Sequence, residues 1–186
     1  MKTIQFVFLM ILVGSGVMAQ NTGGNARKMS REERKAAKDA EELKQMQEVA
    51  LLVRDTFFVM VADRVEDAGS MRVVNPNLNY IAIGRMDMVI QTGLDAGFGG
   101  NNLGGITMVG EMSNLSVKET GKNGFKLLKT NFTNSTGRRL RIEMKISPTG
   151  NTMATVESNV DNFRLIYRGR LKAIEDTRIF EGRTTW

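Results

Sequence analysis

The fold is decided by the stretch RRLRIEMKIS at residues 138–147, in which apolar and charged side chains alternate. Its apolar positions are every second residue, namely Leu140, Ile142, Met144 and Ile146. A period of two over eight residues predicts a β-strand with one buried face. Such a strand needs neighbours along both edges and a layer over its apolar face. We therefore expect the flanking segments to be strands of the same sheet.

Turn-forming residues separate further extended patterns on both sides of this stretch. They occur at residues 121–124, 134–137, 148–151 and 159–162, and no helical pattern lies between them. Consecutive segments should therefore pair as antiparallel neighbours. The predicted fold is mainly β, a single antiparallel meander over residues 56–186 that closes into a small barrel or folds into a sandwich, preceded by one helix.

The last long strand is predicted at residues 163–173, where one face is apolar and the other is basic. A bend is expected at Gly169. The basic face carries Arg164, Arg168, Arg170 and Lys172, with Arg139, Arg141 and Lys145 as candidate neighbours on the next strand. This stripe is either a solvated sheet face or a surface for anionic lipid headgroups or polysaccharide.

Strand-forming residues also precede the glycine-rich part of the chain. β-branched and aromatic residues at 57–65 predict a strand that follows the helix closely. Residues 80–83 predict a second, short strand. Alternation at 86–91 predicts a third, or a continuation of the second past a bulge at Gly84.

A helix is predicted over residues 30–55. Ser30 stands three residues before Glu33, the arrangement of a capping box. Apolar residues then recur at spacings of three and four, at Ala36, Ala40, Leu43, Met46 or Gln47, Ala50, Val53 and Phe57. Because residues 31–44 carry only alanines and mixed charge, they are expected to form a solvated stalk, whereas residues 43–53 can pack on a sheet.

The first 29 residues have the pattern of an export signal followed by a flexible leader. Lys2 precedes an unbroken apolar run at residues 4–13, and small side chains end at Ala19, which predicts a signal peptide at 1–19 and a leader at 20–29. Ten apolar residues are too few to span a bilayer, so no transmembrane segment is expected after cleavage. No cysteine is available for lipid attachment. The predicted location is the periplasm or outer-membrane surface, without N-terminal lipidation.

The most biased composition lies at residues 93–105, which contain six glycines and two asparagines. The segment that follows resembles a strand, which disfavours a phosphate-binding loop, and a single aspartate disfavours a calcium repeat. A glycine-permitted corner is the simplest interpretation. The alternative is a loop that covers a ligand, for which the candidate residues are Gly97, Phe98, Gly99, Gly100, Asn101 and Asn102.

Several segments together resemble a known family. These are FFVMVADRV at 57–65, GGNNLGGITMVGEMS at 99–113, LIYRGRLKAI at 165–174 and RIFEG at 178–182. Over residues 47–182 the chain is similar to the secreted Bacteroidetes domain-of-unknown-function family 4251. The resemblance implies an envelope-associated β domain behind a signal peptide. It implies no activity, cofactor or catalytic residue.

The side chains available for catalysis are few. The chain has no histidine and no cysteine, which removes the commonest general base, the thiolate nucleophile and the usual zinc ligands. Asp63, Asp67 and Glu111 are the acids nearest to a glycosidase-like set, but surface ion pairing explains them more simply. We expect no enzyme activity, no cofactor and no metal.

The sequence therefore predicts a non-catalytic module of the cell envelope. The first interpretation is a binding module for a lipid or other small hydrophobic ligand, and thirteen methionines would suit an adaptable pocket. The alternative is a structural or protein-interaction module with a filled core. A net charge of +6 is modest and the basic stripe lacks interleaved aromatic residues, so nucleic acid is not expected as a partner. The oligomeric state is left open.

Overall fold

The structure is a computed structural model, which describes residues 30–67, 69–93, 106–121, 123–158, 160 and 162–177. The signal peptide expected at 1–19 and the leader expected at 20–29 lie outside the described residues. The end of the predicted β domain, residues 178–186, also lies outside them.

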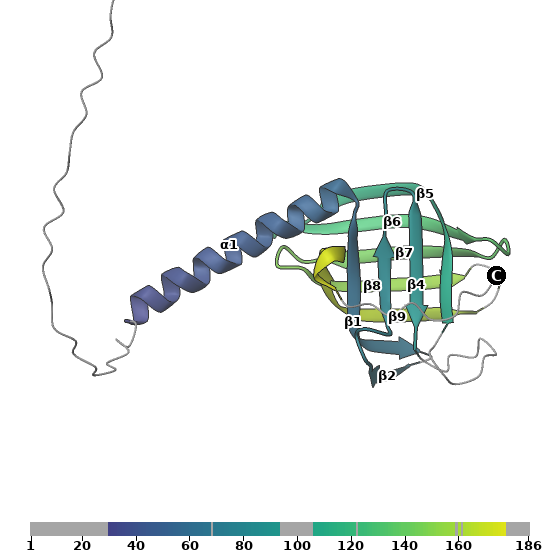
Figure 1. The fold of residues 1–186 in the computed structure, drawn as a ribbon, viewed down its shortest axis with the longest axis horizontal. Helices are drawn as coiled ribbons and strands as arrows, with labels where there is room; N and C mark the ends of the chain where they lie inside the picture. Colours follow the sequence, from purple (N-terminus) through teal and green to yellow (C-terminus); the bar gives the residue numbers. More distant parts are fainter. Residues whose placement is uncertain are drawn as a thin grey trace, which may run out of the picture.

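The described chain is one helix followed by a nine-stranded antiparallel sheet and a short 3-10 turn (Figure 1). The elements are α1 Arg31–Asp55, β1 Phe58–Asp67, β2 Ser70–Val73, β3 Tyr80–Ile83, β4 Asp87–Thr92, β5 Ile106–Thr120, β6 Phe125–Asn134, β7 Arg139–Ile146, β8 Asn151–Ser158, β9 Arg164–Lys172 and η1 Ile174–Asp176. Each strand from β3 to β9 pairs with the next, so the expected meander is confirmed.

The sheet closes into a barrel because β1 also pairs with β9 along its whole length. The first half of β1, residues 58–61, pairs with β3 on its other side. Its second half, residues 64–67, pairs with β2 instead. Eight strands therefore form the ring, and β2 is an added edge strand that the sequence did not predict. Of the two predicted arrangements, the barrel is confirmed and the sandwich is wrong.

The pairing of β1 with β9 is irregular at one point, between Ala62 and Arg64, where the register shifts. Gly169 of β9 lies opposite Ala62 at this shift. A Cβ atom at Gly169 would meet the carbonyl oxygen of Val61 and would lie 2.7 Å from Cα of Ala62. Glycine is therefore required here by the close approach of two backbones, at the position where the sequence predicted a bend.

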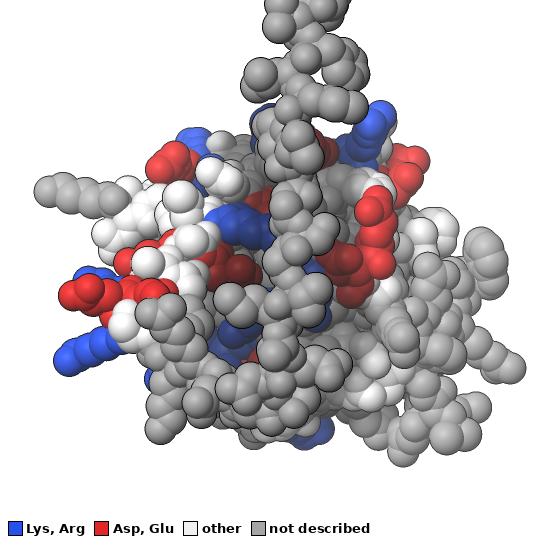
Figure 2. All heavy atoms as spheres, turned by 60° about the vertical axis from the view of Figure 1, so that its left-hand side comes forward, with Lys and Arg blue, Asp and Glu red and all other residues white. Residues whose placement is uncertain are grey.

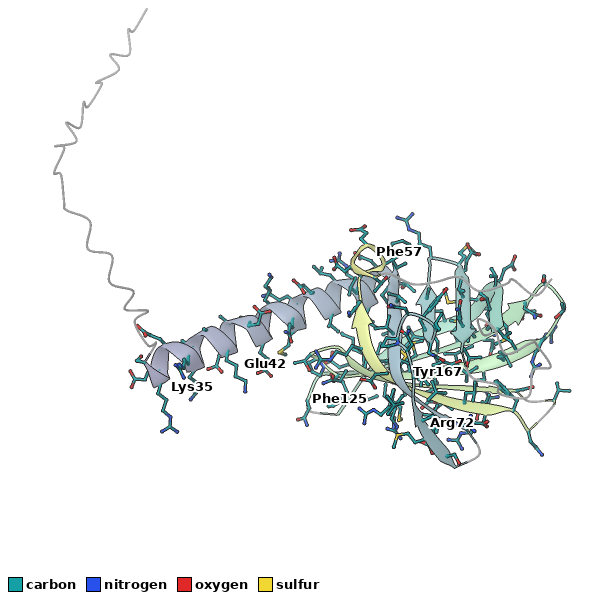
Figure 3. The ribbon with its side chains drawn as sticks, turned by 60° about the horizontal axis from the view of Figure 1, so that its bottom comes forward. Lys35, Glu42, Phe57, Arg72, Phe125 and Tyr167 are labelled. Carbon is teal, nitrogen blue, oxygen red and sulfur yellow. The ribbon has the colours of Figure 1, made fainter. Side chains whose placement is uncertain are left out.

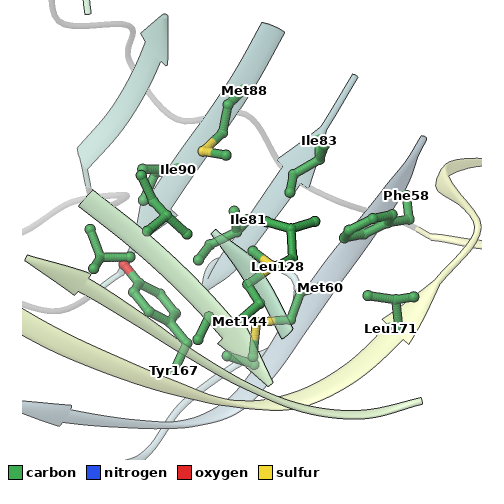
Figure 4. Packing of buried hydrophobic residues seen from close by; sticks show 14 of the residues in the cluster. Phe58, Met60, Ile81, Ile83, Met88, Ile90, Leu128, Met144, Tyr167 and Leu171 are labelled. Atoms are coloured by element: carbon green, nitrogen blue, oxygen red, sulfur yellow. The ribbon is translucent and has the colours of Figure 1, made fainter. Parts of the chain in front are cut away.

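The barrel interior is packed with apolar side chains from all eight ring strands (Figure 4). On β7, residues Leu140, Ile142, Met144 and Ile146 are all buried, and the charged residues between them face outward, so the predicted alternation is confirmed. Figure 4 shows Met60, Ile81, Leu128 and Met144 close together near the centre, with Phe58 and Tyr167 on opposite sides of them. Eight strands enclose an interior that side chains can just fill or that can hold one small ligand, and here side chains fill the described part.

A second, smaller cluster buries part of the outer wall. Val59 and Val61 of β1 and Tyr80 of β3 are buried there, and Ile174 of η1 packs against them. Residues 58–62 of β1 are consequently buried on both faces. A strand buried on both faces shows no alternation, so β1 was predictable from its β-branched and aromatic residues and not from a period of two.

The helix α1 begins as predicted at a capping box and ends near the barrel. The side chain of Ser30 accepts a hydrogen bond from the backbone N–H of Glu33, and the Glu33 side chain accepts one from the backbone N–H of Ser30. The helix ends at Asp55 because Thr56 takes a left-handed conformation with φ of 51°. No helix in the described part of the chain is both long enough and apolar enough to cross a bilayer.

Only Val49 and Val53 of α1 are buried, and they contact the end of the barrel. The predicted apolar stripe is wrong in part, since Leu43 is 56% exposed and Phe57, which lies between α1 and β1, is 46% exposed. The helix turns a different line of residues toward the barrel, because Val49 and Val53 are four apart and share one face. Residues 31–48 are exposed, and Figures 1 and 3 show this part, with Lys35 and Glu42, projecting away from the barrel.

We expect Ser30→Ala to loosen the first turn of α1 without destabilising the barrel. Loss of an N-cap costs about 1 kcal/mol of helix stability. This loss should not lower the stability of the barrel, because residues 31–48 of α1 are exposed. Amide hydrogen exchange over residues 31–36 should therefore accelerate by roughly fivefold. The urea midpoint of global unfolding should stay unchanged. Lys35→Ala, an exposed change without a capping role, is the control, and a fall in the global midpoint for Ser30→Ala alone would contradict this account.

Candidate functional site

The outer wall of the barrel carries a hollow of about 610 Å³ that is lined by residues of five strands, β1, β6, β7, β8 and β9. We call it the cationic groove. Its lining residues are Asp63, Arg64, Phe125, Lys145, Ser147, Asn151, Thr152, Met153, Arg168, Gly169 and Arg170. Four of them are cations and one is an acid. The groove therefore has a surplus of positive charge, larger than that of the three other hollows lined by residues 45–176 that are compared with it.

Strand register sets the order of the side chains across the groove. Arg64 of β1 lies opposite Arg168 of β9, which lies opposite Met153 of β8, which lies opposite Lys145 of β7. One row further along, Arg170 lies opposite Asn151. All six side chains are on the outer face, because residues that alternate with them along the strands, namely Val65, Met144, Ala154, Tyr167 and Leu171, point inward.

Two of the four cations are paired with acids and two are not. Nε of Arg64 lies 3.0 Å from a carboxylate oxygen of Asp63, and an Nη atom of Arg168 lies 3.5 Å from a carboxylate oxygen of Glu66. Within the residues that the structure describes, Arg170 and Lys145 form no ion pair. The groove therefore keeps a surplus of positive charge on β7 and β9.

The predicted basic stripe is divided by the structure. Arg168 and Arg170 line the groove, whereas Arg164 lies opposite Glu157 of β8 and Lys172 lies toward the helix. The expectation that Arg139, Arg141 and Lys145 stand on the strand next to β9 is wrong, because β8 lies between β9 and β7.

Acidic side chains are interspersed with these cations. Arg141 pairs with Glu157 at 3.7 Å, and Lys129 pairs with Glu143 at 2.8 Å. On the side of the molecule from which α1 projects, Figure 2 likewise shows acidic and basic side chains intermixed. These ion pairs balance part of the positive charge on the wall outside the groove.

A second hollow of about 520 Å³ lies between the end of α1 and β9. Val49 and Leu52 of the helix and Leu171 of β9 supply its apolar lining. Glu48 and Asp176 bring negative charge, and Arg170 and Lys172 bring positive charge. Since the charges balance, this hollow selects for neither anions nor cations.

The other predicted site residues are not brought together. The candidate ligand-covering loop, Gly97 to Asn102, lies outside the described residues. Asp63 lies on β1 and forms an ion pair with Arg64. Glu111 lies on β5, opposite Asp87 of β4, and the strands β3 and β4 separate β5 from β1. The described residues contain no group of three acids or other ligands that could hold a metal ion.

Tyr167 is an ionisable residue whose side chain lies inside the barrel. Burial raises the pKa of the Tyr167 hydroxyl above its usual value, and the polar side chain of Thr92 opposes that shift. Figures 3 and 4 show Tyr167 enclosed by the strands. The interior therefore holds this phenol in its neutral form.

This burial predicts a loss of stability in alkali. The pKa of Tyr167 is higher in the folded state than in the unfolded state, so its contribution is complete below about pH 10 and declines as pH rises above it. The free energy of unfolding should fall by about 1.4 kcal/mol per pH unit in that range from this group. Urea unfolding between pH 8 and 11.5 measures it. Tyr167→Phe should remove this share of the decline, and parallel curves for the two proteins would contradict it.

The sequence did not predict that Arg64, Phe125 and Met153 would line one groove with Arg168 and Arg170. Arg64 is separated from Arg168 by 104 positions, and Phe125 and Met153 belong to other hairpins. The groove depends on the pairing of the first strand with the last, and no local pattern encodes that pairing. The alternation of each strand does place these side chains outward, which was the only available signal.

The fold and its surface define a class, an eight-stranded antiparallel barrel closed by its first and last strands, with a projecting N-terminal helix and a basic outer groove. Residues 38–171 match the family model described as "Domain of unknown function (DUF4251)". The chain belongs to this family.

Comparison with solved structures supports the same fold. The crystal structure of a DUF4251 family protein from Bacteroides eggerthii DSM 20697 is similar, with a TM-score of 0.63 and 21% sequence identity. The match covers 79% of this chain and 99% of the other chain. No curated protein matches the chain.

Proposed function

We propose that this protein is a non-catalytic module of the bacterial cell envelope, exported by its N-terminal segment, that contacts its partner on the outer wall of the barrel. The observation that carries this proposal is the packing of the interior. Twenty-two buried residues form one continuous cluster there, and each is at most 7% exposed. An eight-stranded barrel can hold a ligand only if its own side chains do not fill the interior.

Two features of the interior support this conclusion. Large side chains from opposite walls, among them Phe58, Phe132 and Tyr167, are completely buried. The end of the barrel near the helix is covered by Val49 and Val53, which belong to the same cluster. A hydrophobic ligand would have to displace these contacts, and displacing a packed core costs several kcal/mol.

The proposed test is native mass spectrometry, combined with lipid extraction, on the full chain expressed with its own N-terminal segment and purified from the periplasm. We expect the mass of the polypeptide alone, because the interior is occupied by its own side chains. A lipid or other small molecule bound at one copy per chain would overturn the proposal. The supernatant after spheroplast formation tests export in the same preparation.

The second candidate is a binding module for a lipid or other small hydrophobic ligand. It is favoured by four methionines in the interior cluster, Met60, Met88, Met108 and Met144. Methionine side chains are flexible and can repack around a guest more readily than branched residues. This candidate requires the interior to open, so it predicts slower hydrogen exchange of β4 and β7 when such a ligand is added.

A further inference from the structure

We infer that the cationic groove is a binding site for an acidic glycan, a chain of sugars that carries carboxylate or phosphate groups. This inference deepens the proposed function, on which it rests, by naming the class of partner for the outer wall. It is argued from the charge, the span and the uncharged lining of the groove.

The charge of the groove requires an anion. Lining cations exceed lining acids by four to one, and the acids that face them are Asp63 and, beside the groove, Glu66. These two acids form ion pairs with Arg64 and Arg168. Arg170 and Lys145 remain, on opposite sides of β8, with no acid of the described chain bound to either. They are available for two negative groups of a ligand.

The span of the groove requires an extended ligand. Arg64 and Lys145 are three strand steps apart, which is about 14 Å at the usual spacing of strands in a sheet. A single phosphate or carboxylate cannot reach both ends of such a row. A chain with acidic groups at intervals can, and it would lie across β1, β9, β8 and β7.

The uncharged lining matches sugar rather than a bare polyanion. The Asn151 side chain is exposed and makes no hydrogen bond within the described residues, so it can bind a hydroxyl group. Oγ of Ser147 lies 3.3 Å from Oγ1 of Thr149 and is only partly buried. Phe125 is 41% exposed and, like Met153, lines the groove, so the lining also includes an aromatic side chain and a thioether. Polar donors next to an aromatic face suit the hydroxyl groups and the carbon-bound hydrogens of a sugar ring.

The test uses a pentamer of galacturonic acid as the probe, with its methyl ester as an uncharged control, titrated into the full chain by calorimetry. We expect binding of the acid and none of the ester. Raising the salt concentration should weaken the interaction, because the contacts are ionic. No binding of the acid at 50 mM salt would overturn the inference.

Variants locate the site. Lys145→Gln combined with Arg170→Gln should weaken binding of the acidic pentamer at least tenfold. Lys35→Gln combined with Lys38→Gln, which removes the same charge from the exposed part of α1, should leave it unchanged. An equal loss for both pairs would show attraction by net charge alone and overturn the inference.

Two further probes separate glycan from other anions. Phe125→Ala should weaken the pentamer about fivefold, and inorganic tripolyphosphate should bind more weakly than the pentamer and be insensitive to Phe125→Ala. Tight binding of tripolyphosphate, or of vesicles with anionic lipid in place of the pentamer, would overturn the assignment to a glycan. These results are independent of the mass measurement above. If no lipid co-purifies and the pentamer does not bind, the glycan inference is wrong but the proposed function, contact through the outer wall, is not contradicted. If a lipid co-purifies at one copy per chain, the proposed function itself is wrong.

Discussion

Gly169→Ala is expected to lower the free energy of unfolding by about 3 kcal/mol or more, or to prevent folding. The added methyl group would meet the carbonyl oxygen of Val61 and lie 2.7 Å from Cα of Ala62. Both are backbone atoms, so relief requires β1 to move away from β9 at the point where the barrel closes. Urea unfolding followed by circular dichroism measures the effect.

A second glycine provides the matched control. Gly84→Ala places its methyl group 3.4 Å from the Asp87 carbonyl oxygen, an ordinary contact. This change should leave stability unaltered or raise it by up to about 1 kcal/mol, because alanine restricts the unfolded chain. Equal urea midpoints for the two variants would show that β1 and β9 are not in close contact.

Ile142→Ala is expected to cost about 3 kcal/mol, the second largest effect. Ile142 is completely buried in the interior cluster, in the middle of β7 and paired on both sides, with Thr130 of β6 and Val156 of β8. Deleting its outer carbons leaves a cavity that the closed ring of strands cannot fill by collapsing. The measurement is again the urea midpoint.

The neighbouring residue tests the register of the same strand. Arg141 faces outward and pairs with Glu157 at 3.7 Å, with about half of its side chain exposed. Arg141→Ala should therefore cost less than about 1 kcal/mol. Because a slip of one residue exchanges the two faces, a larger loss for Arg141→Ala than for Ile142→Ala would contradict the register.

Alternation made β6 to β9 predictable from the sequence. Each of these strands has one buried face, and short turns with glycine, asparagine or proline connect β6 to β7 and β7 to β8. The same reasoning failed for β2, whose four residues are all exposed and carry no pattern of burial. Alternation did not indicate β1, whose residues 58–62 are buried on both faces, and this strand was predicted from its β-branched and aromatic residues. An alternating pattern therefore identifies strands that are buried on one face, but not strands that are exposed or buried on both faces.

The groove was less predictable than the fold. Arg168 and Arg170 could be placed on an outer face from the period of β9, but their partners could not. The Arg168 to Glu66 contact joins residues 102 positions apart, which only barrel closure brings together. The basic stripe carries less net positive charge in the structure than its own sequence suggests, because acids of neighbouring strands lie next to two of its residues: Glu157 is opposite Arg164, and Glu66 pairs with Arg168. The start of the helix was predicted correctly from its cap, whereas its buried face was predicted only in part: Val53 of the predicted stripe is buried, but Val49, the other buried residue of α1, was not on that stripe.

The pairing of β1 with β9 also has a consequence for the order of events when the chain folds. Met60 and Leu171 are strand partners separated by 111 positions, so the ring cannot close until almost the whole domain is present. Contacts of such long range make folding slow. Until the last strand arrives, β1 exposes an unpaired edge with apolar side chains, which is a template for association with other chains. We therefore expect the yield of folded protein to depend on dilution and on chaperones more than its final stability would indicate.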